Sequence, residues 1–202
     1  MKKLQHEIRD PIHGFVKIYD DERKILDSIV LQRLRDIHQL ALTYLLYPSA
    51  THKRFEHSLG VMELATKVFD VITDSDNLLP EVLNMLPELK NEDSKRYWRK
   101  VLRIAALCHD IGHLPFSHAG EKELFPDGWD HERMTAELIK NELAESLRNL
   151  SIPVRWEDVV KVALGEKRVK EIYPDWELSR WEIILSEIIV SEVFGVDRMD
   201  YL

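Results

Sequence analysis

Cysteine, glycine and proline are scarce in this chain of 202 residues, which has one cysteine, seven glycines and eight prolines. Because the single cysteine, Cys108, cannot form an internal disulfide, we expect a protein of the reducing cytoplasm. Long apolar runs are also missing, since Arg103 and Glu187 interrupt the most apolar stretches. The first residues turn polar where a signal peptide would be apolar, so we expect neither a membrane span nor a secretion signal.

Basic residues are fewer than acidic residues. Lysine and arginine number 28 against 36 acidic residues, which gives a net charge of −8. This balance excludes the broad basic face that non-specific nucleic-acid binding needs, although it leaves room for a local basic pocket. Hydrophobic residues are 45% of the chain, enough to exclude disorder as the main state. We therefore expect one globular domain over residues 1–202.

Apolar residues recur at the helical period through most of the chain. The exception is the start, where apolar residues flank a turn at 10–14 and predict two short strands. Asp20–Asp21 would cap the start of a short helix that carries Ile25, Leu26 and Ile29. The further expected helices cover 31–42, a long segment from about 52, 95–111, 116–124, 130–143, 156–164, 178–190 and a last one from about 196. Residues 74–95 are polar and contain two prolines, so we predict a surface insertion with one short helix. The fold class is all-α, a helical bundle with a short N-terminal β-hairpin.

Candidate metal ligands begin with His109 and Asp110, which end a mostly apolar helix. A buried aspartate is costly unless it is paired or binds a metal. Alone, such a pair is more often a core histidine beside a capping aspartate. Two further polar clusters in apolar surroundings change that balance, because they add His57 and Asp197. Two imidazoles and two carboxylates suit Fe, Mn or Zn and leave positions for water.

This arrangement resembles the metal motif of the HD-domain phosphohydrolases. Four segments are more specific still, and they resemble the deoxynucleoside triphosphate triphosphohydrolase branch, in which an HD domain is sometimes joined to a SAM domain. They are 10–14 (DPIHG), 32–35 (QRLR), 49–61 (SATHKRFEHSLGV) and 109–118 (HDIGHLPFSH). The resemblance is good over 8–72, 98–135 and 187–202 and weak over 74–95 and 140–185. It implies an HD-domain helical bundle.

The resemblance further implies a reaction. Water attacks the phosphorus nearest the sugar of a deoxynucleoside triphosphate, releasing nucleoside and triphosphate, with one divalent transition metal in the site and Mg on the substrate phosphates. His118 corresponds to the acid that protonates the departing oxygen, and Glu121 would orient its ring. His113 and His131 correspond to histidines that contact the phosphates. Read without the resemblance, His118 is an exposed first-turn histidine and His131 a helix-start residue.

Other matched positions concern the substrate and a regulator. Arg54 corresponds to a phosphate contact, with an internal ion pair to Glu56 or another acid as the alternative. Positions matched to sugar, base or substrate contacts are Gln39, Leu40, Arg198 and Tyr201. Positions matched to a guanine nucleotide effector site at a subunit contact in a homo-oligomer are Asp27, Gln32 and Arg35. Without the resemblance, Gln39 is a core hydrogen-bonding side chain, and the effector positions form an ordinary solvated helix face.

The sequence departs from this branch at its end, five residues after Asp197, whereas related enzymes continue with helices that close the nucleotide pocket. Residues 42–46 are also bulkier than the glycine-rich stretch often found there. Two alternatives therefore stay open. One is an HD-type phosphohydrolase that acts on another phosphoester, such as a nucleoside monophosphate or a cyclic nucleotide. The other is a catalytically inactive nucleotide-sensing module.

Overall fold

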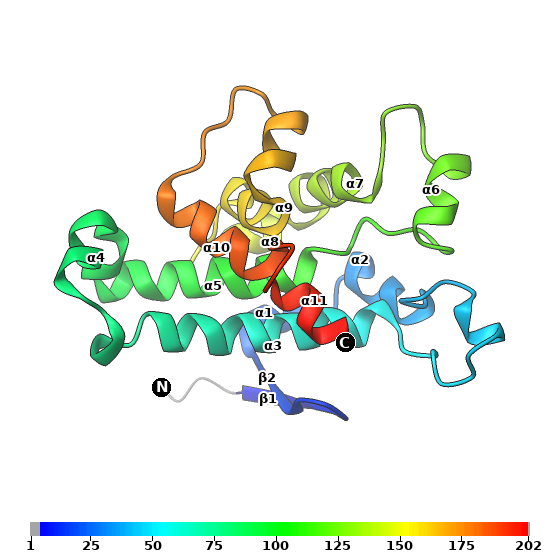
Figure 1. The fold of residues 1–202 in the computed structure, drawn as a ribbon, viewed down its shortest axis with the longest axis horizontal. Helices are drawn as coiled ribbons and strands as arrows, with labels where there is room; N and C mark the ends of the chain where they lie inside the picture. Colours follow the sequence, from blue (N-terminus) through cyan, green and yellow to red (C-terminus); the bar gives the residue numbers. More distant parts are fainter. Residues whose placement is uncertain (1–4, 202) are drawn as a thin grey trace.

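The structure, a computed structural model, describes residues 5–201 and the side chains of residues 6–200. As predicted, it is a helical bundle with one two-stranded sheet at the N-terminal end (Figure 1). The strands are β1 (Gln5–Asp10) and β2 (Gly14–Tyr19). The α-helices are α1 (Asp20–Leu26), α2 (Ile29–Gln32), α3 (Arg54–Ile72), α4 (Pro80–Met85), α5 (Glu92–Cys108), α6 (His118–Leu124), α7 (His131–Leu138), α8 (Ala144–Arg148), α9 (Trp156–Ile172), α10 (Arg180–Val190) and α11 (Val196–Tyr201). Single 3₁₀ turns are η1 (Arg33–Asp36), η2 (Thr43–Leu45), η3 (Ser75–Asn77) and η4 (Pro87–Lys90), and η5 (Ile139–Leu143) is a π turn.

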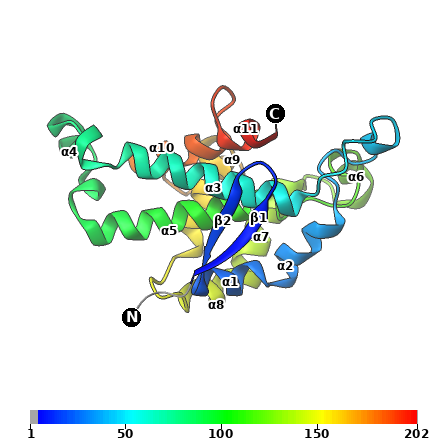
Figure 2. The ribbon, with the colours of Figure 1, turned by 90° about the horizontal axis from the view of Figure 1, so that it is seen from below.

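The hairpin forms at the turn that the sequence predicts. The Asp10 carboxylate accepts hydrogen bonds from the backbone N–H of Ile12 at 2.8 Å and of His13 at 2.7 Å, an Asx turn. Gly14 follows with φ +78°, a conformation that only glycine adopts without strain. Alternate residues of β2, Val16 and Ile18, are buried, so one face of the hairpin packs on the helices (Figure 2).

The long helices α3 and α5 lie side by side, between the hairpin and the helices α9 and α10 (Figure 1). In α3 the positions at helical spacing that the sequence predicts to be apolar are all buried, from Phe55 through Leu59 and Met62 to Phe69. In α5 the residues from Val101 to Cys108 are all buried, which leaves the following His109 and Asp110 in the interior. No helix within residues 5–201 is both long enough and apolar enough to cross a membrane.

A buried ionic network joins the hairpin to the helices. Arg103 of α5 donates two hydrogen bonds to the Glu22 carboxylate of α1, at 2.8 and 2.9 Å. It also donates to Thr66 Oγ1 of α3 at 2.7 Å and to the carbonyl of Lys17 in β2 at 2.7 Å. Since a buried charge is tolerated only when it is paired and fully hydrogen-bonded, this guanidinium fixes four elements relative to one another.

The helix predicted over 31–42 is wrong beyond Asp36. At Ile37 the chain becomes extended, with φ −102° and ψ 115°, and it pairs with the residues that precede α3. The Arg54 N–H donates to the Ile37 carbonyl at 2.9 Å, and the Gln39 N–H to the His52 carbonyl at 3.1 Å. Tertiary pairing of the backbone therefore overrides the helical pattern here, and it brings residues 37–42 beside the start of α3.

Two other predicted segments differ in detail. The region 74–95 is more ordered than expected, since it contains η3, α4 and η4, and Leu86 and Leu89 within it are buried. The helix predicted over 156–164 continues to Ile172 across a break at Gly165, where φ is +76°. A glycine with positive φ redirects the chain without ending its helical course, and apolar periodicity does not reveal such a break.

Candidate functional site

Four predicted metal ligands come together from three helices. His57 lies in the first turn of α3, His109 and Asp110 directly follow α5, and Asp197 lies in the first turn of α11. His57 Nε2 lies 2.9 Å from Asp197 Oδ1 and 3.8 Å from Asp110 Oδ2. His109 Nε2 lies 3.4 Å from Asp197 Oδ1 and 3.5 Å from Asp110 Oδ1. The four side chains thus surround one small volume with nitrogen and oxygen donors.

His109 presents a buried ring nitrogen to the cluster. His109 Nδ1 lies 2.8 Å from the carbonyl of Ala106, which can only accept a hydrogen bond, so Nδ1 carries the proton. Its Nε2 is buried and has no hydrogen-bond partner among the described residues, although a buried polar atom is normally paired. One donor atom each of His57, His109 and Asp110 lies within 4.8 Å of the others. This donor set and the unpaired nitrogen fit a divalent transition metal.

Neighbouring charges and hydrogen bonds shift the pKa values of the proposed metal ligands. Burial alone would raise the pKa of Asp110, but His109, His113 and Arg54 around it hold that pKa well below its usual range. Burial would lower the pKa of His57, but hydrogen bonds to Asp197 and Asp200 and the charge of Asp110 raise it to about 9. In the absence of a metal His57 therefore carries a proton at neutral pH, and a metal must displace that proton.

Arg54 pairs with an acid inside the protein, as the alternative to a phosphate contact predicts. The acid is Asp110 rather than Glu56, because the Glu56 carboxylate accepts a hydrogen bond from the Lys53 N–H at the start of α3. A second nitrogen of Arg54 donates to Ser117 Oγ at 2.7 Å. Arg54 also lines the pocket described below, so the pair with Asp110 leaves part of the guanidinium facing the space next to the metal ligands.

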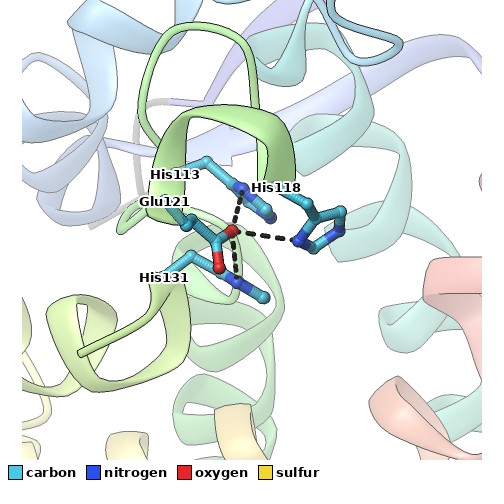
Figure 3. Close-up of side chains that lie close together, drawn as sticks. All are labelled: His113, His118, Glu121 and His131. Atoms are coloured by element: carbon cyan, nitrogen blue, oxygen red, sulfur yellow. Dashed lines mark hydrogen bonds and ion pairs between the residues drawn. The ribbon is translucent and has the colours of Figure 1, made fainter. Parts of the chain in front are cut away.

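The predicted catalytic residues form a second cluster, in which three imidazoles face one carboxylate (Figure 3). Glu121 Oε1 lies 2.9 Å from Nδ1 of His118, 2.9 Å from Nδ1 of His131 and 3.7 Å from Nδ1 of His113. The rings of His113 and His131 stack at 3.9 Å between centroids. His113 also joins the two clusters, because its Nε2 lies 3.4 Å from Asp110 Oδ1.

Burial decides the charge of two of these rings. It lowers the pKa of His113 to about 4, and it lowers the pKa of His131 despite the nearby carboxylate of Glu121. Both are therefore neutral at pH 7. His118 is different, because 71% of its side chain is exposed to solvent. Its place as the first residue of α6 is the one that the alternative interpretation predicts, yet its ring is held by Glu121 and faces the pocket.

The loop from Gly112 to His118 positions the histidines of the second cluster. Gly112 lies against the first turn of α7, where a Cβ atom would come within 1.9 Å of the His131 carbonyl, so only glycine lets α7 approach this closely. Phe116 and Ser117 have φ of +71° and +50°, a strained conformation for residues with side chains. The hydrogen bond from Arg54 to Ser117 helps to stabilise this strained conformation, directly before His118.

An open pocket of about 590 Å³ lies between the two clusters. It is lined by residues from both clusters and by four of the predicted substrate contacts, Gln39, Leu40, Arg54 and Arg198. The Gln39 Oε1 atom is buried and has no hydrogen-bond partner among the described residues, so it is not the satisfied core side chain of the alternative interpretation. The side chain of Tyr201 lies outside the described residues.

The predicted effector residues do not reach this pocket. Asp27 accepts a hydrogen bond from Arg23 at 3.1 Å on the surface of α1. The Gln32 amide donates to the Leu26 carbonyl at 2.8 Å, and Arg35 donates to Gln32 at 2.8 Å. These contacts are local.

A larger hollow of about 750 Å³ lies at the Gly165 break of α9, away from both clusters. Glutamates outnumber basic residues along its lining, so it would repel a triphosphate. We therefore place the functional site at the smaller pocket, where the metal ligands and imidazoles meet.

Two residues of the site with nearly buried side chains escaped prediction as functional residues. Asp200 accepts a hydrogen bond from His57 Nδ1 at 2.8 Å, and His13 Nε2 lies 2.5 Å from the other Asp200 oxygen. His13 stands in the segment 10–14 (DPIHG) and Asp200 in the region 187–202, both of which resemble the branch, but the contact joins positions 187 residues apart. The one available signal was the spacing, since Asp200 is one helical turn after Asp197.

Comparison with known proteins identifies the family of this chain. The model of the HD domain matches residues 54–202. The chain is 37% identical over 142 residues to the deoxynucleoside triphosphate triphosphohydrolase SAMHD1 homolog of Dictyostelium discoideum, covering 68% of this chain and 25% of that protein. It is 38% identical over 133 residues to the deoxynucleoside triphosphate triphosphohydrolase SAMHD1 of Homo sapiens, covering 62% of this chain and 19% of that protein.

Solved structures extend the likeness to nearly the whole chain. A hypothetical protein of Aquifex aeolicus matches with a TM-score of 0.69 and 35% identity, covering 98% of this chain and 45% of that one. A phosphohydrolase of Bacteroides thetaiotaomicron matches with a TM-score of 0.69 and 28% identity, covering 98% of this chain and 41% of that one. This chain thus spans less than half the length of either structure and about a quarter or less of the two curated relatives.

Proposed function

The chain belongs to the HD-domain family, in the branch that resembles deoxynucleoside triphosphate triphosphohydrolases, and from that premise we propose that it cleaves deoxynucleoside triphosphates to nucleoside and triphosphate. The observation that carries the proposal is the meeting of two clusters at one pocket. Two of the metal donors, Asp110 and Asp197, line one side, and the three imidazoles held around Glu121 line the other. A phosphoryl transfer needs both a cation and proton donors next to the same phosphate.

HD domains bind a divalent metal, and the residues that would hold it here are His57, His109, Asp110 and Asp197. When bound, the metal lowers the pKa of water and offsets the charge that builds on the phosphoryl oxygens. The 45% exposure of the Asp197 side chain leaves this face of the site open to water and substrate. Nitrogen and oxygen donors together suit Fe, Mn or Zn, and Mg would accompany the triphosphate.

The protein supplies the proton for the leaving sugar oxygen from His118. Glu121 accepts the Nδ1–H of this ring, which leaves Nε2 turned to the pocket to hold the proton that the oxygen takes. Solvent exposure of the side chain lets His118 regain a proton after each turnover. His113 and His131 would contact the phosphates as neutral rings that add no full charge, because burial lowers both pKa values. Arg54 would supply the positive charge for the same phosphates.

The remaining pocket residues would hold the nucleoside. Gln39 has an unpaired buried oxygen and Leu40 an apolar surface at the same rim, which suit a sugar hydroxyl and a base edge. Arg198, one residue after Asp197, and Tyr201 are further candidates for substrate contact. We keep Asp27, Gln32 and Arg35 as candidates for a guanine nucleotide effector in a homo-oligomer, because the segment 32–35 (QRLR) resembles the deoxynucleoside triphosphate triphosphohydrolase branch.

Product analysis tests the proposal. Purified protein loaded with Mn²⁺ or Fe²⁺ is incubated with each deoxynucleoside triphosphate in water enriched in ¹⁸O. We expect nucleoside and inorganic triphosphate, with the label in the triphosphate, because attack at the phosphorus nearest the sugar breaks its bond to the sugar oxygen. Release of single phosphates would show a different phosphoester reaction. No turnover of any nucleotide by metal-loaded protein would favour the sensing module.

A further inference from the structure

The Asp200 carboxylate lies behind the site, between two histidines. Its side chain is 7% exposed and its two oxygens face different imidazoles. Oδ2 lies 2.8 Å from His57 Nδ1, and Oδ1 lies 2.5 Å from His13 Nε2. We propose that Asp200 and His13 are positioning residues for His57, a proposal that rests on the metal site of the proposed function.

The contact with Asp200 fixes which nitrogen of His57 is available. A carboxylate accepts the Nδ1–H, so the ring must present Nε2 on its opposite side, and that atom faces Asp110 and Asp197. A carboxylate behind a histidine ligand also makes the ring a stronger base and restricts its rotation. Asp200 therefore prepares His57 for a cation without touching that cation.

His13 satisfies the second oxygen of Asp200. A buried carboxylate with one partner would be costly, and His13 supplies the other hydrogen bond. The position of His13 is itself fixed, because its backbone N–H donates to Asp10 Oδ1 at 2.7 Å in the hairpin turn. The turn between β1 and β2 is thus connected to the metal ligand His57 by two hydrogen bonds in series, between His13 and Asp200 and between Asp200 and His57.

Gly60 leaves the space that the side chains of Asp200 and His13 occupy. It lies in α3, three residues after His57, and on the same side of the helix. A Cβ atom at this position would come within 1.9 Å of Asp200 Oδ1 and 2.8 Å of His13 Nε2. Only a residue without a side chain lets the carboxylate and the imidazole lie against α3 at this point.

The test measures metal affinity rather than rate alone. Asp200→Asn keeps the size of the side chain and removes its charge. We expect the variant to bind Mn²⁺ about 10- to 100-fold more weakly than the wild type, which is the usual effect of losing a residue behind a metal ligand. His13→Gln should weaken binding in the same direction and by less. With saturating Mn²⁺, kcat should return close to the wild-type value, which a general disturbance of the fold would prevent.

The hairpin offers a matched control in a second histidine–aspartate pair. His6 Nε2 lies 2.8 Å from Asp20 Oδ1, on the surface and away from the site. Asp20→Asn and His6→Gln should therefore bind Mn²⁺ like the wild type. If Asp200→Asn does so too, the proposal is overturned. Should that variant fail to fold by circular dichroism, His13→Gln decides by the same criterion. A wild-type protein that binds no metal would instead overturn the proposed function.

Discussion

Replacing His118 by alanine separates the chemistry of the site from its stability. The side chain is 71% exposed, and within the described part of the chain its ring hydrogen-bonds to Glu121 at 2.9 Å. Since an ion pair with one solvent-exposed partner contributes little, the substitution should change the free energy of unfolding by no more than about 1 kcal/mol. Metal content should not change, because His118 is not among the four proposed ligands.

The rate should respond very differently. A positioned proton donor contributes about 10²- to 10⁴-fold to a reaction of this type. We therefore expect His118→Ala to lose about 10²-fold or more in kcat, equivalent to roughly 3 kcal/mol in the barrier. Glu121→Gln should lose less, because Glu121 orients the ring and does not give the proton. Glu123→Ala, on the exposed side of the same helix, serves as the control and should keep wild-type activity.

The assay compares two leaving groups. One substrate is a deoxynucleoside triphosphate, whose sugar oxygen needs a proton on departure. The other is the p-nitrophenyl ester of triphosphate, whose phenolate leaves without one. The defect of His118→Ala should be large on the first substrate and small on the second. An equally large defect on both would refute the role of His118 as the acid and point to His113 or His131.

Three further outcomes follow from the same geometry. Asp110→Asn should abolish metal binding and hydrolysis while the helical circular dichroism persists, and wild-type turnover would contradict the assigned site. Arg103→Met should cost about 3–5 kcal/mol in chemical denaturation, because it leaves the Glu22 carboxylate buried without its partner; a cost below about 1 kcal/mol would disprove this role. Burial lowers the pKa of His113 from 6.5 to about 4, so the unfolded chain binds a proton that the folded chain does not. The metal-free protein should therefore keep this contribution above pH 6.5 and lose about 3 kcal/mol of stability as the pH falls to 4, and His113→Gln should flatten that slope in urea titrations.

Helical periodicity predicted the parts of this fold that pack by one apolar face. Helix α3 is the clearest case, since Phe55, Leu59 and Met62 are buried as their spacing requires. Periodicity failed at Ile37, where the chain has apolar residues at helical spacing but pairs as extended backbone with the residues before α3. Such pairing depends on tertiary contacts that a local pattern does not contain.

The site, too, has residues that the sequence predicts and residues whose role depends on tertiary contacts. His57, His109 and Asp197 could be proposed as metal ligands because their residue types and apolar surroundings restrict what they can do. Asp200 could not, because an aspartate near the end of a helix has many uses on the surface. Its role depends on His13, which reaches it from the opposite end of the sequence. Contacts of this kind become visible only when the fold brings distant segments together.

The central claim is that His57, His109, Asp110 and Asp197 hold one catalytic metal. It is tested most directly by anomalous X-ray diffraction from crystals of Mn²⁺-loaded protein, measured on both sides of the manganese absorption edge. The account predicts one strong peak with nitrogen and oxygen ligands at about 2.0–2.2 Å, donated by these four side chains. A peak at another set of residues, or none in protein that hydrolyses nucleotides, would contradict it.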